Sequence, residues 1–313
     1  MLGFFLRRLA SSLLLLAVVT TATFFLVFAG GEAIARRVVG ELATSEAVAA
    51  KAAELGLDQP VVSQFAVWIG NALRGDLGRS WFTSEPVVDA IIGRLVVTFS
   101  IVLIVIVITA VVSVGLGMAA AVRRGWIDRL VQVLAIVGYA IPSFIIAIIL
   151  VTLFAIQLKL FPATGFTPIT QDPGAWGLSL ALPVTALVIS TVASTAQQIR
   201  SSLIDVLRRD YVRTLRSRGL GESEILWKHV LRSASPPGLT VLALQFIGLL
   251  GGTVIVEQVF ALPGLGYLAV QSTARGDLPV VLGVVIVTVL LVVVVNLVID
   301  LLIAWLNPKA RLS

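Results

Sequence analysis

The chain has 313 residues, of which 58% are hydrophobic and only 13% are charged, and its mean hydropathy is +1.04. Soluble domains are nearer ~45–50% apolar and ~25% charged, so the composition excludes a water-soluble globule. The net charge of +6 does not indicate nucleic-acid binding, because the Lys and Arg residues lie beside the ends of apolar runs. The sequence has no Cys, which excludes disulfides, thiolate catalysis and Cys-bound metals.

The first apolar run, residues 9–29, follows Arg7 and Arg8. It is long enough for a helix to cross ~30 Å of hydrocarbon, which takes about 20 residues. A secretory signal also has a basic start, but its apolar stretch usually has only ~7–15 residues. We therefore expect this run to stay attached as a membrane anchor.

Five further apolar runs are long enough to cross a membrane. They cover residues 95–122, 130–158, 178–196, 239–256 and 280–306. Pro142 lies inside the third run, where it removes a helical hydrogen bond, so we expect a kink or break near residues 139–143. The sequence thus predicts an all-α polytopic membrane protein with six transmembrane helices.

Six crossings would put both termini on one side of the membrane, together with the loops 123–129 and 197–238. These segments hold 15 of the 23 Lys and Arg residues. Of the remaining eight, six lie in the long segment 30–94, where the positive-inside rule is weak. The distribution of basic residues therefore predicts that both termini are cytoplasmic.

These spans divide the chain into three parts. We expect residues 1–94 to form the first span and a long extracytoplasmic loop, residues 95–306 a five-helix core with a cytoplasmic loop at 199–237, and residues 307–313 a cytoplasmic tail. Within the outer loop, an Ala- and Glu-rich stretch around 41–55 and an amphipathic stretch at 61–73 predict helices in a small ordered cap.

Common catalytic motifs are absent from the sequence. It contains no GxxxxGK[ST], GxGxxG, HExxH or GxSxG pattern, so neither nucleotide hydrolysis nor a standard hydrolase centre can be placed. The single histidine, His229, has no paired nucleophile or ligand, which favours a surface or interface role. Glu257 and Asp300 lie near predicted span ends, where a carboxylate can reach the interface, so we favour a structural role over a proton relay.

The loop at 210–237 reads DYVRTLRSRGLGESEILWKHVLRSASPP. A short basic helix should end at Gly219, because Gly accepts the positive φ of a helix C-cap. A second helix should begin near Glu222, whose charge suits a helix N-terminus, and should run to about Ser235 before Pro236 and Pro237 stop it. The pattern predicts a helix–turn–helix knob, although a basic loop held by anionic lipid headgroups has the same composition.

This loop closely resembles the EAA loop of binding-protein-dependent ABC importer permeases, in the form typical of the dipeptide/oligopeptide/nickel group. The matching positions are Asp210, Tyr211, Val212, Arg213, Thr214, Arg216, Gly219, His229, Leu231, Arg232 and Pro236. The departures are Leu215, where Ala is usual, Gly221, where Ser is usual, and the run 235–237, where Leu-Leu-Pro is common.

The resemblance extends over nearly the whole chain, in the order that this family shows. The matching segments are LGLDQP at 55–60, NALRGDLGRS at 71–80, AVRRGWIDRL at 121–130, IPSF at 141–144, LFPATGF at 160–166, GGTVIVEQVFALPGLG at 251–266, RGDLPVVLG at 275–283 and NLVIDLL at 296–302. The long first outer loop is similar to that of the B-type permease subunit. One departure is the start of this loop, which reads AGGE at 29–32 where a Pro-Gly-Asp-Pro element is usual.

The resemblance implies a type I ABC importer permease fold and a coupling helix that docks in a groove of an ATPase subunit. The implied coupling residues are Asp210, Tyr211, Val212, Arg213, Thr214, Leu215, Arg216, Arg218 and Gly219. Among these, Tyr211, Val212 and Leu215 would supply buried contact area, and the arginines would set orientation. The implied gate or receptor-facing residues are Glu257, Phe260, Pro263, Gly264, Gly266 and Asp277.

The same resemblance implies the partners and the location of the chain. We expect a permease subunit of the bacterial cytoplasmic (inner) membrane that is not an enzyme and binds no metal or cofactor of its own. ATP and magnesium would be held by two ATP-binding subunits or domains. The other expected partners are a second homologous permease subunit, an extracytoplasmic substrate-binding protein and the lipid bilayer, with no nucleic acid.

The substrate stays open at the level of sequence. Di- and oligopeptides are the main expectation, and nickel chelates, glutathione and glycosides are alternatives within the same machinery. An ATP-independent secondary carrier would predict inverted repeats and midplane charges, neither of which the sequence shows. A membrane scaffold that only binds a protein through its cytoplasmic knob is a further alternative.

Overall fold

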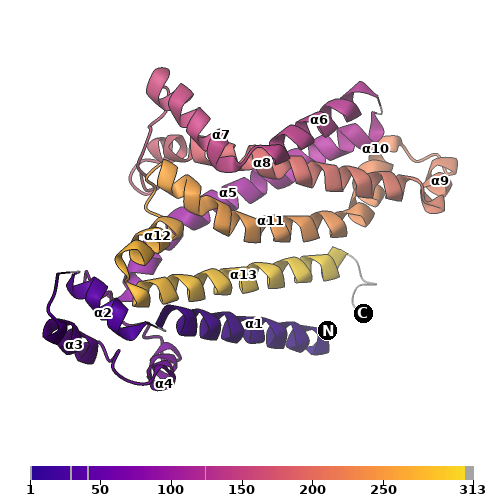
Figure 1. The fold of residues 1–313 in the computed structure, drawn as a ribbon. Coiled ribbons are helices and arrows are strands. Elements are labelled where there is room, and N and C mark those ends of the chain that lie inside the picture. The colour runs from indigo at the N-terminus through magenta and orange to yellow at the C-terminus, as the bar shows by residue number, and fades with distance from the viewer. Residues whose placement is uncertain (1, 29, 41, 124, 307–313) are drawn as a thin grey trace. The chain divides into compact units, whose positions relative to one another are not determined.

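The computed structural model describes residues 2–28, 30–40, 42–123 and 125–306, and within these ranges the chain is mostly helical (Figure 1). The isolated bridge between Arg79 and Pro86 is the only strand-like pairing in the described part. The chain forms two compact units. Among the described residues, unit 1 contains 99–262 and 294–306, and unit 2 contains 2–98 and 263–293.

Five helical spans in the described residues are long and apolar enough to cross a membrane. They are Arg7–Phe28 within α1 (Leu2–Phe28), Val87–Val122 (α5), Pro173–Leu207 (α8), Glu222–Val259, and Leu278–Ile303 within α13 (Leu278–Leu306). A sixth is obtained when the bent pair Asp128–Gly138 and Ser143–Gln157 is counted as one span. The six predicted spans correspond to these helices on that count.

The third predicted span is broken where Pro142 interrupts it. α6 (Trp126–Ala140) ends two residues before α7 (Ser143–Leu150), which continues as the π-helix η1 (Val151–Gln157), and the two arms meet at 91°. Pro142 has no N–H to give to the carbonyl of Gly138, so the ladder of α6 cannot continue through it. The predicted break is confirmed.

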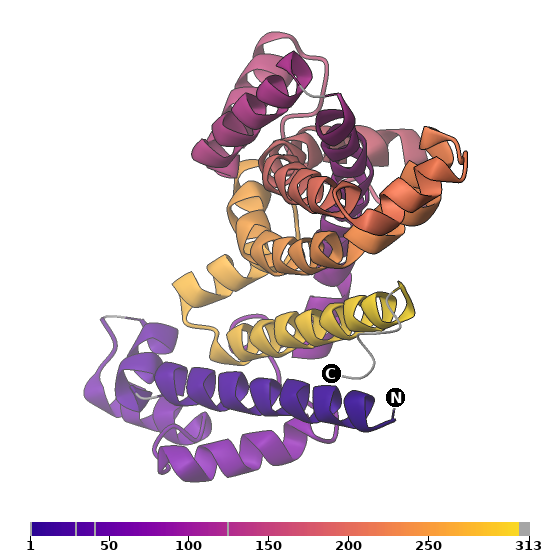
Figure 2. The same cartoon turned by 90° about the vertical axis from the view of Figure 1, so that its right-hand side faces the viewer.

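α8 is central to unit 1 and packs against α6, α7 and α11 (Leu231–Val259), which surround it in Figure 2. Gly138 of α6 lets α6 pack close to α8, since a Cβ at this position would lie only 3.0 Å from the carbonyl oxygen of Ile189 in α8. α5 joins α8 through a 2.7 Å hydrogen bond between the hydroxyls of Thr109 and Thr191. Small residues and hydroxyl hydrogen bonds are the usual means of packing membrane helices.

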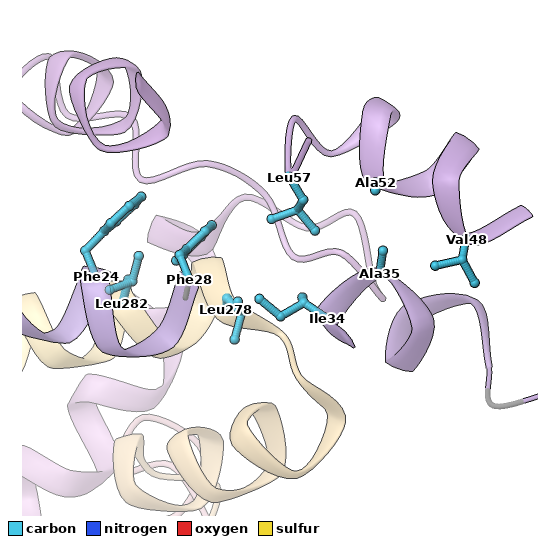
Figure 3. Packing of buried hydrophobic residues seen from close by; sticks show 9 residues of the cluster. All are labelled: Phe24, Phe28, Ile34, Ala35, Val48, Ala52, Leu57, Leu278 and Leu282. Atoms are coloured by element: carbon cyan, nitrogen blue, oxygen red, sulfur yellow. The ribbon is translucent and has the colours of Figure 1, made fainter. Parts of the chain in front are cut away.

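Unit 2 carries the cap that the sequence predicts after the first span. Its two expected helices are α3 (Ser45–Glu54) and α4 (Val61–Ala72), and a third helix, α2 (Gly31–Val39), precedes them. Figure 3 shows the side chains that join this cap to α1 and α13, among which Phe24 and Phe28 stack at 4.3 Å. The buried members of this cluster are Phe24, Phe28, Ile34, Ala35, Val48, Ala52, Leu57, Leu278 and Leu282.

One predicted helix end is wrong. The helix that begins at α10 (Glu222–Glu224) and η2 (Ile225–Val230) does not stop at Pro236 and Pro237 but continues through them to Val259 as α11. Pro236 has no N–H to donate to the carbonyl of Arg232 one turn before it. The hydroxyl of Ser235 donates a 2.9 Å hydrogen bond to that carbonyl instead. Such side-chain bonds let prolines remain inside membrane helices.

Candidate functional site

The candidate coupling helix is α9 (Asp210–Ser217), which Figure 1 shows at the C-terminal end of α8. Asp210 lies in its first turn, where a negative charge suits the helix dipole. After Arg218, Gly219 has φ +81°, its N–H donates to the carbonyl of Arg216 at 2.9 Å, and the next N–H, from Leu220, donates to Leu215 at 3.3 Å. This is the Schellman pattern of a helix end, so the predicted stop at Gly219 is confirmed.

α9 is braced to α10 by an ion pair with fork geometry. Nε of Arg216 lies 2.6 Å from one carboxylate oxygen of Glu222, and Nη2 lies 3.1 Å from the other. This hydrogen bonding raises the pKa of Arg216 above its ordinary value, so the guanidinium stays charged. The side chain of Arg216 is therefore engaged by Glu222 of the same chain, and this ion pair fixes the turn between α9 and α10.

The apolar face of α9 packs into unit 1. Val212 is fully buried, and Leu215 packs partly buried beside it. The buried side chains of this cluster come from α5, α8, α9, η2 and α11; they are Met118, Ala121, Ile199, Leu203, Val206, Val212, Ile225, Val230 and Ala234. The expectation that Val212 lends contact area to a partner is thus corrected, because its side chain is buried in its own chain. Leu215 is only partly buried, so its contact with a partner stays a prediction.

The exposed face of α9 is polar with one aromatic residue. Tyr211 is 37% exposed, and the side chains of Asp210 and Arg213 lie 3.7 Å apart at its edge with most of their surface free. Thr214 and Arg218 are also exposed. Trp227 of η2 is 58% exposed. The sequence analysis did not single out Trp227, although a Trp among charged residues in a cytoplasmic loop is a sequence signal for an exposed contact residue.

The predicted gate or receptor-facing residues fall in both units. Glu257 and Phe260 belong to unit 1, where Glu257 has no exposed surface and Phe260 only 2%. Pro263, Gly264 and Gly266 lie in unit 2 at the start of α12 (Leu265–Arg275). The predicted gate or receptor-facing residues therefore do not form one exposed surface within either unit.

Asp277, which was expected among the gate or receptor-facing residues, is buried within unit 2 and so forms no part of an exposed receptor-facing surface. Its carboxylate accepts hydrogen bonds from the hydroxyl of Ser80 at 2.5 Å and from the backbone N–H of Trp81 at 3.1 Å. Asp277 thus pins the turn that precedes α5 within unit 2. Beside it lies a cavity of about 320 Å³ whose lining includes the charged residues Asp89, Arg94 and Arg275.

Comparisons with known proteins agree with this architecture. Residues 112–312 match the family described as binding-protein-dependent transport system inner membrane component, and residues 1–102 match the N-terminal part of such a membrane component. The chain belongs to this family. Its members are permease components of transport systems, so the sequence resemblance to ABC importer permeases is confirmed.

Relatives named as transport system permeases match most of the chain. A putative peptide transport system permease protein of Brucella abortus is 40% identical over 88% of both chains. A probable peptide ABC transporter permease protein of Sinorhizobium fredii is 35% identical over 88% of both chains. The glutathione transport system permease protein GsiC of Escherichia coli is 36% identical, again over 88% of both chains.

A solved structure supports the fold. The inward-facing MetNI methionine ABC transporter contains a chain that aligns over its whole length with 72% of this chain, with a TM-score of 0.57 and 16% identity. The expected ABC importer permease fold is therefore confirmed, and the protein is a multi-pass membrane permease.

Proposed function

We propose that this permease is one half of the passage of an ATP-driven importer that carries peptides across a bacterial cytoplasmic membrane. A second permease subunit would complete the passage, and a substrate-binding protein outside the cell membrane would deliver the peptide. Both termini and α9 would lie in the cytoplasm, as the distribution of basic residues favours. The relatives named as peptide permeases support the substrate class.

The single observation that carries this proposal is the construction of α9. Its apolar face is anchored through Val212 to the cluster on α5, α8 and α11, while Tyr211 and Arg213 remain on the exposed face. A partner that moves this exposed face also moves the long helices, because the buried face cannot slide independently. This geometry suits a lever between ATP-binding subunits and membrane helices.

Such coupling requires that the partner bind the two states of the permease with different affinity. Closure of two ATP-binding subunits would draw α9 with it and would tilt α8 and α11 as rigid elements. The exposed charges, Asp210, Arg213 and Arg218, would set orientation and encounter rate more than affinity. The energy for uphill transport would enter through ATP hydrolysis in the partner.

Glutathione is a second candidate substrate, because the relative GsiC is named for its transport. Glutathione and ordinary peptides share amide groups, so the same permease machinery could carry either. Uptake of each by the complete transporter would distinguish them.

Affinity purification from native membranes tests the proposed assembly. This chain, tagged and extracted in mild detergent, should bring down ATP-binding subunits and a second permease, which mass spectrometry would identify. Recovery of this chain alone, in a folded preparation that transports without ATP, would contradict the proposal and favour a secondary carrier.

A further inference from the structure

The cap helix α4 is apolar but too short to cross a membrane. Residues 61–73 include no charged residue, although Asp58 precedes them and Arg74 follows them. An apolar helix of about 10–14 residues is usually either a core helix of the protein or a segment at the membrane interface. No residue of α4 is buried, so α4 is not a core helix.

One face of α4 joins the helix to the rest of unit 2. Val61, Phe65 and Trp68 are half-buried and pack against the cluster shown in Figure 3. The ring centroid of Phe65 lies 5.2 Å from that of Phe24 and 5.5 Å from that of Phe25. These contacts place α4 beside the C-terminal end of α1, as Figure 1 also shows.

A second face of α4 is apolar and exposed. It is a stripe of four residues with the spacing i, i+4, i+7 and i+11, which puts them on one side of a helix. These residues are Val62, Ala66, Ile69 and Leu73. Val62 is 67% exposed and Leu73 is 83% exposed. The rest of the described chain therefore leaves most of this apolar stripe uncovered.

The polar side chains of α4 lie on its other exposed edge. Ser63, Gln64 and Asn71 line a cavity of about 400 Å³ beside α1. Val67 is an apolar exception on this edge. No residue of the apolar stripe lines the cavity. The two exposed edges of α4 thus differ, because one carries groups that bind water and the other offers only hydrocarbon.

The apolar stripe adjoins the exposed side of α1. At 3.6 residues per turn, Phe65 lies nearer to the stripe around α4 than Trp68 does. The ring of Phe65 contacts Phe25, which is 36% exposed, whereas the ring of Trp68 lies against Phe24, which is 1% exposed. The next residue of α1, Leu26, is 80% exposed. The exposed apolar surface therefore continues from α1 to α4.

The depth of α4 follows from the same contact. Phe25 belongs to the membrane span Arg7–Phe28 and lies three residues before its end. At 1.5 Å per residue this is about 4–5 Å inside the end of the span. Helices of the membrane interface bury their apolar face roughly 5–10 Å into the boundary between headgroups and acyl chains. The contact of Phe65 with Phe25 thus places α4 at this depth.

We infer that α4 lies in the membrane interface, where Val62, Ala66, Ile69 and Leu73 face the lipid acyl chains of the leaflet in which α1 ends. In the orientation proposed above, this is the outer leaflet. The cap is then held at the lipid surface by α4 as well as by its link to α1. The inference does not depend on which substrate the permease carries.

The first test measures what surrounds the stripe. The chain has no Cys, so Ala66→Cys introduces its only thiol for a nitroxide label. The complete transporter, with Cys-free partner subunits, is placed in phospholipid nanodiscs. Electron paramagnetic resonance then measures collisions of the label with oxygen, which concentrates in hydrocarbon, and with a nickel chelate, which stays in water. At position 66, collisions with oxygen should dominate.

Asn71→Cys is the matched control, since Asn71 is an exposed residue on the polar edge of the same helix. Its label should collide more often with the nickel chelate. Two results at position 66 would overturn the inference. Dominant collisions with the nickel chelate would show that the stripe faces water. Rare collisions with both reagents would show that a protein, such as the second permease subunit or the binding protein, covers the stripe.

The second test needs no label. Val62→Asp with Leu73→Asp places two charges among the acyl chains, so amide hydrogen exchange of residues 61–72 in nanodiscs should become about tenfold faster or more. Ser63→Asp with Asn71→Asp adds the same charges on the polar edge and should leave this exchange unchanged. Copurification with the ATP-binding subunits shows that both variants assemble. Equal exchange in the two double variants would contradict the placement of the stripe in lipid.

Discussion

At the scale of single residues, Gly219 determines where α9 ends. Its φ of +81° lies in the left-handed region, and a Cβ there would meet no neighbour within 4 Å. A substitution therefore acts through backbone strain alone. This makes the position a clean probe of whether the geometry of the turn matters for coupling.

Gly219→Val should weaken coupling, because a left-handed conformation costs an L-residue roughly 1–2 kcal/mol, and more for a β-branched side chain. The measurement is ATP hydrolysis of the assembled transporter with and without substrate-loaded binding protein, and stimulation should fall. Gly221→Val is the control, since Gly221 has φ −67° and equally open surroundings. Equal stimulation in both variants would show that the turn does not need a positive φ.

Asp277 acts on the loop before α5 through charge-assisted hydrogen bonds, which are about twice as strong as neutral ones. Asp277→Asn should loosen residues 80–86 by about 1–3 kcal/mol, because the hydroxyl of Ser80 and the N–H of Trp81 lose an ionised acceptor. Amide hydrogen exchange of residues 80–86 should become faster. Asp58→Asn, on an exposed residue of the same unit, is the control and should leave that exchange unchanged. Unchanged exchange of residues 80–86 in Asp277→Asn would show that the hydrogen bonds of Asp277 do not hold this loop.

At the scale of elements, α9 works through two faces with different tasks. The buried face joins it to the long helices, and the exposed face is available to a partner. Changes on the exposed face should therefore spare folding and impair coupling, whereas changes at Val212 would affect both.

Tyr211→Ala with Arg213→Glu should abolish substrate-stimulated ATP hydrolysis while the protein still inserts and assembles. The pair removes an exposed ring and reverses a charge at the proposed contact, without touching the buried cluster. Tyr211→Phe with Arg213→Lys, which keeps the ring and the charge, should retain stimulation. Normal stimulation in the first double variant would contradict the role assigned to α9.

Several elements could be predicted because a local rule decides them. The end of α9 follows from Gly219, and the break of the third span follows from Pro142. Pro236 was misjudged because the hydroxyl of Ser235 replaces its missing hydrogen bond, a compensation that depends on the folded helix. The role of Val212 could not be predicted, since an amphipathic helix has the same pattern whether its apolar face meets its own chain or a partner.

At the scale of the whole molecule, the apolar runs predict the spans but not their full length. α5 and α8 have 36 and 35 residues, because helical hydrogen bonding continues beyond the apolar stretch. A cavity beside the break between α6 and α7 was also beyond sequence reasoning, since it brings together Gly138, Ser190 and Gln245 from three helices. The buried contacts of Asp277 could not be predicted for the same reason: its partners are almost 200 positions away in the sequence.

The central claim is that ATP hydrolysis by partner subunits drives a ligand through this permease. The most direct measurement is tripeptide accumulation in proteoliposomes that contain the complete transporter and its binding protein. Accumulation above the external concentration should occur with ATP and should disappear with a non-hydrolysable analogue or without the binding protein. Accumulation that persists without ATP would contradict this account.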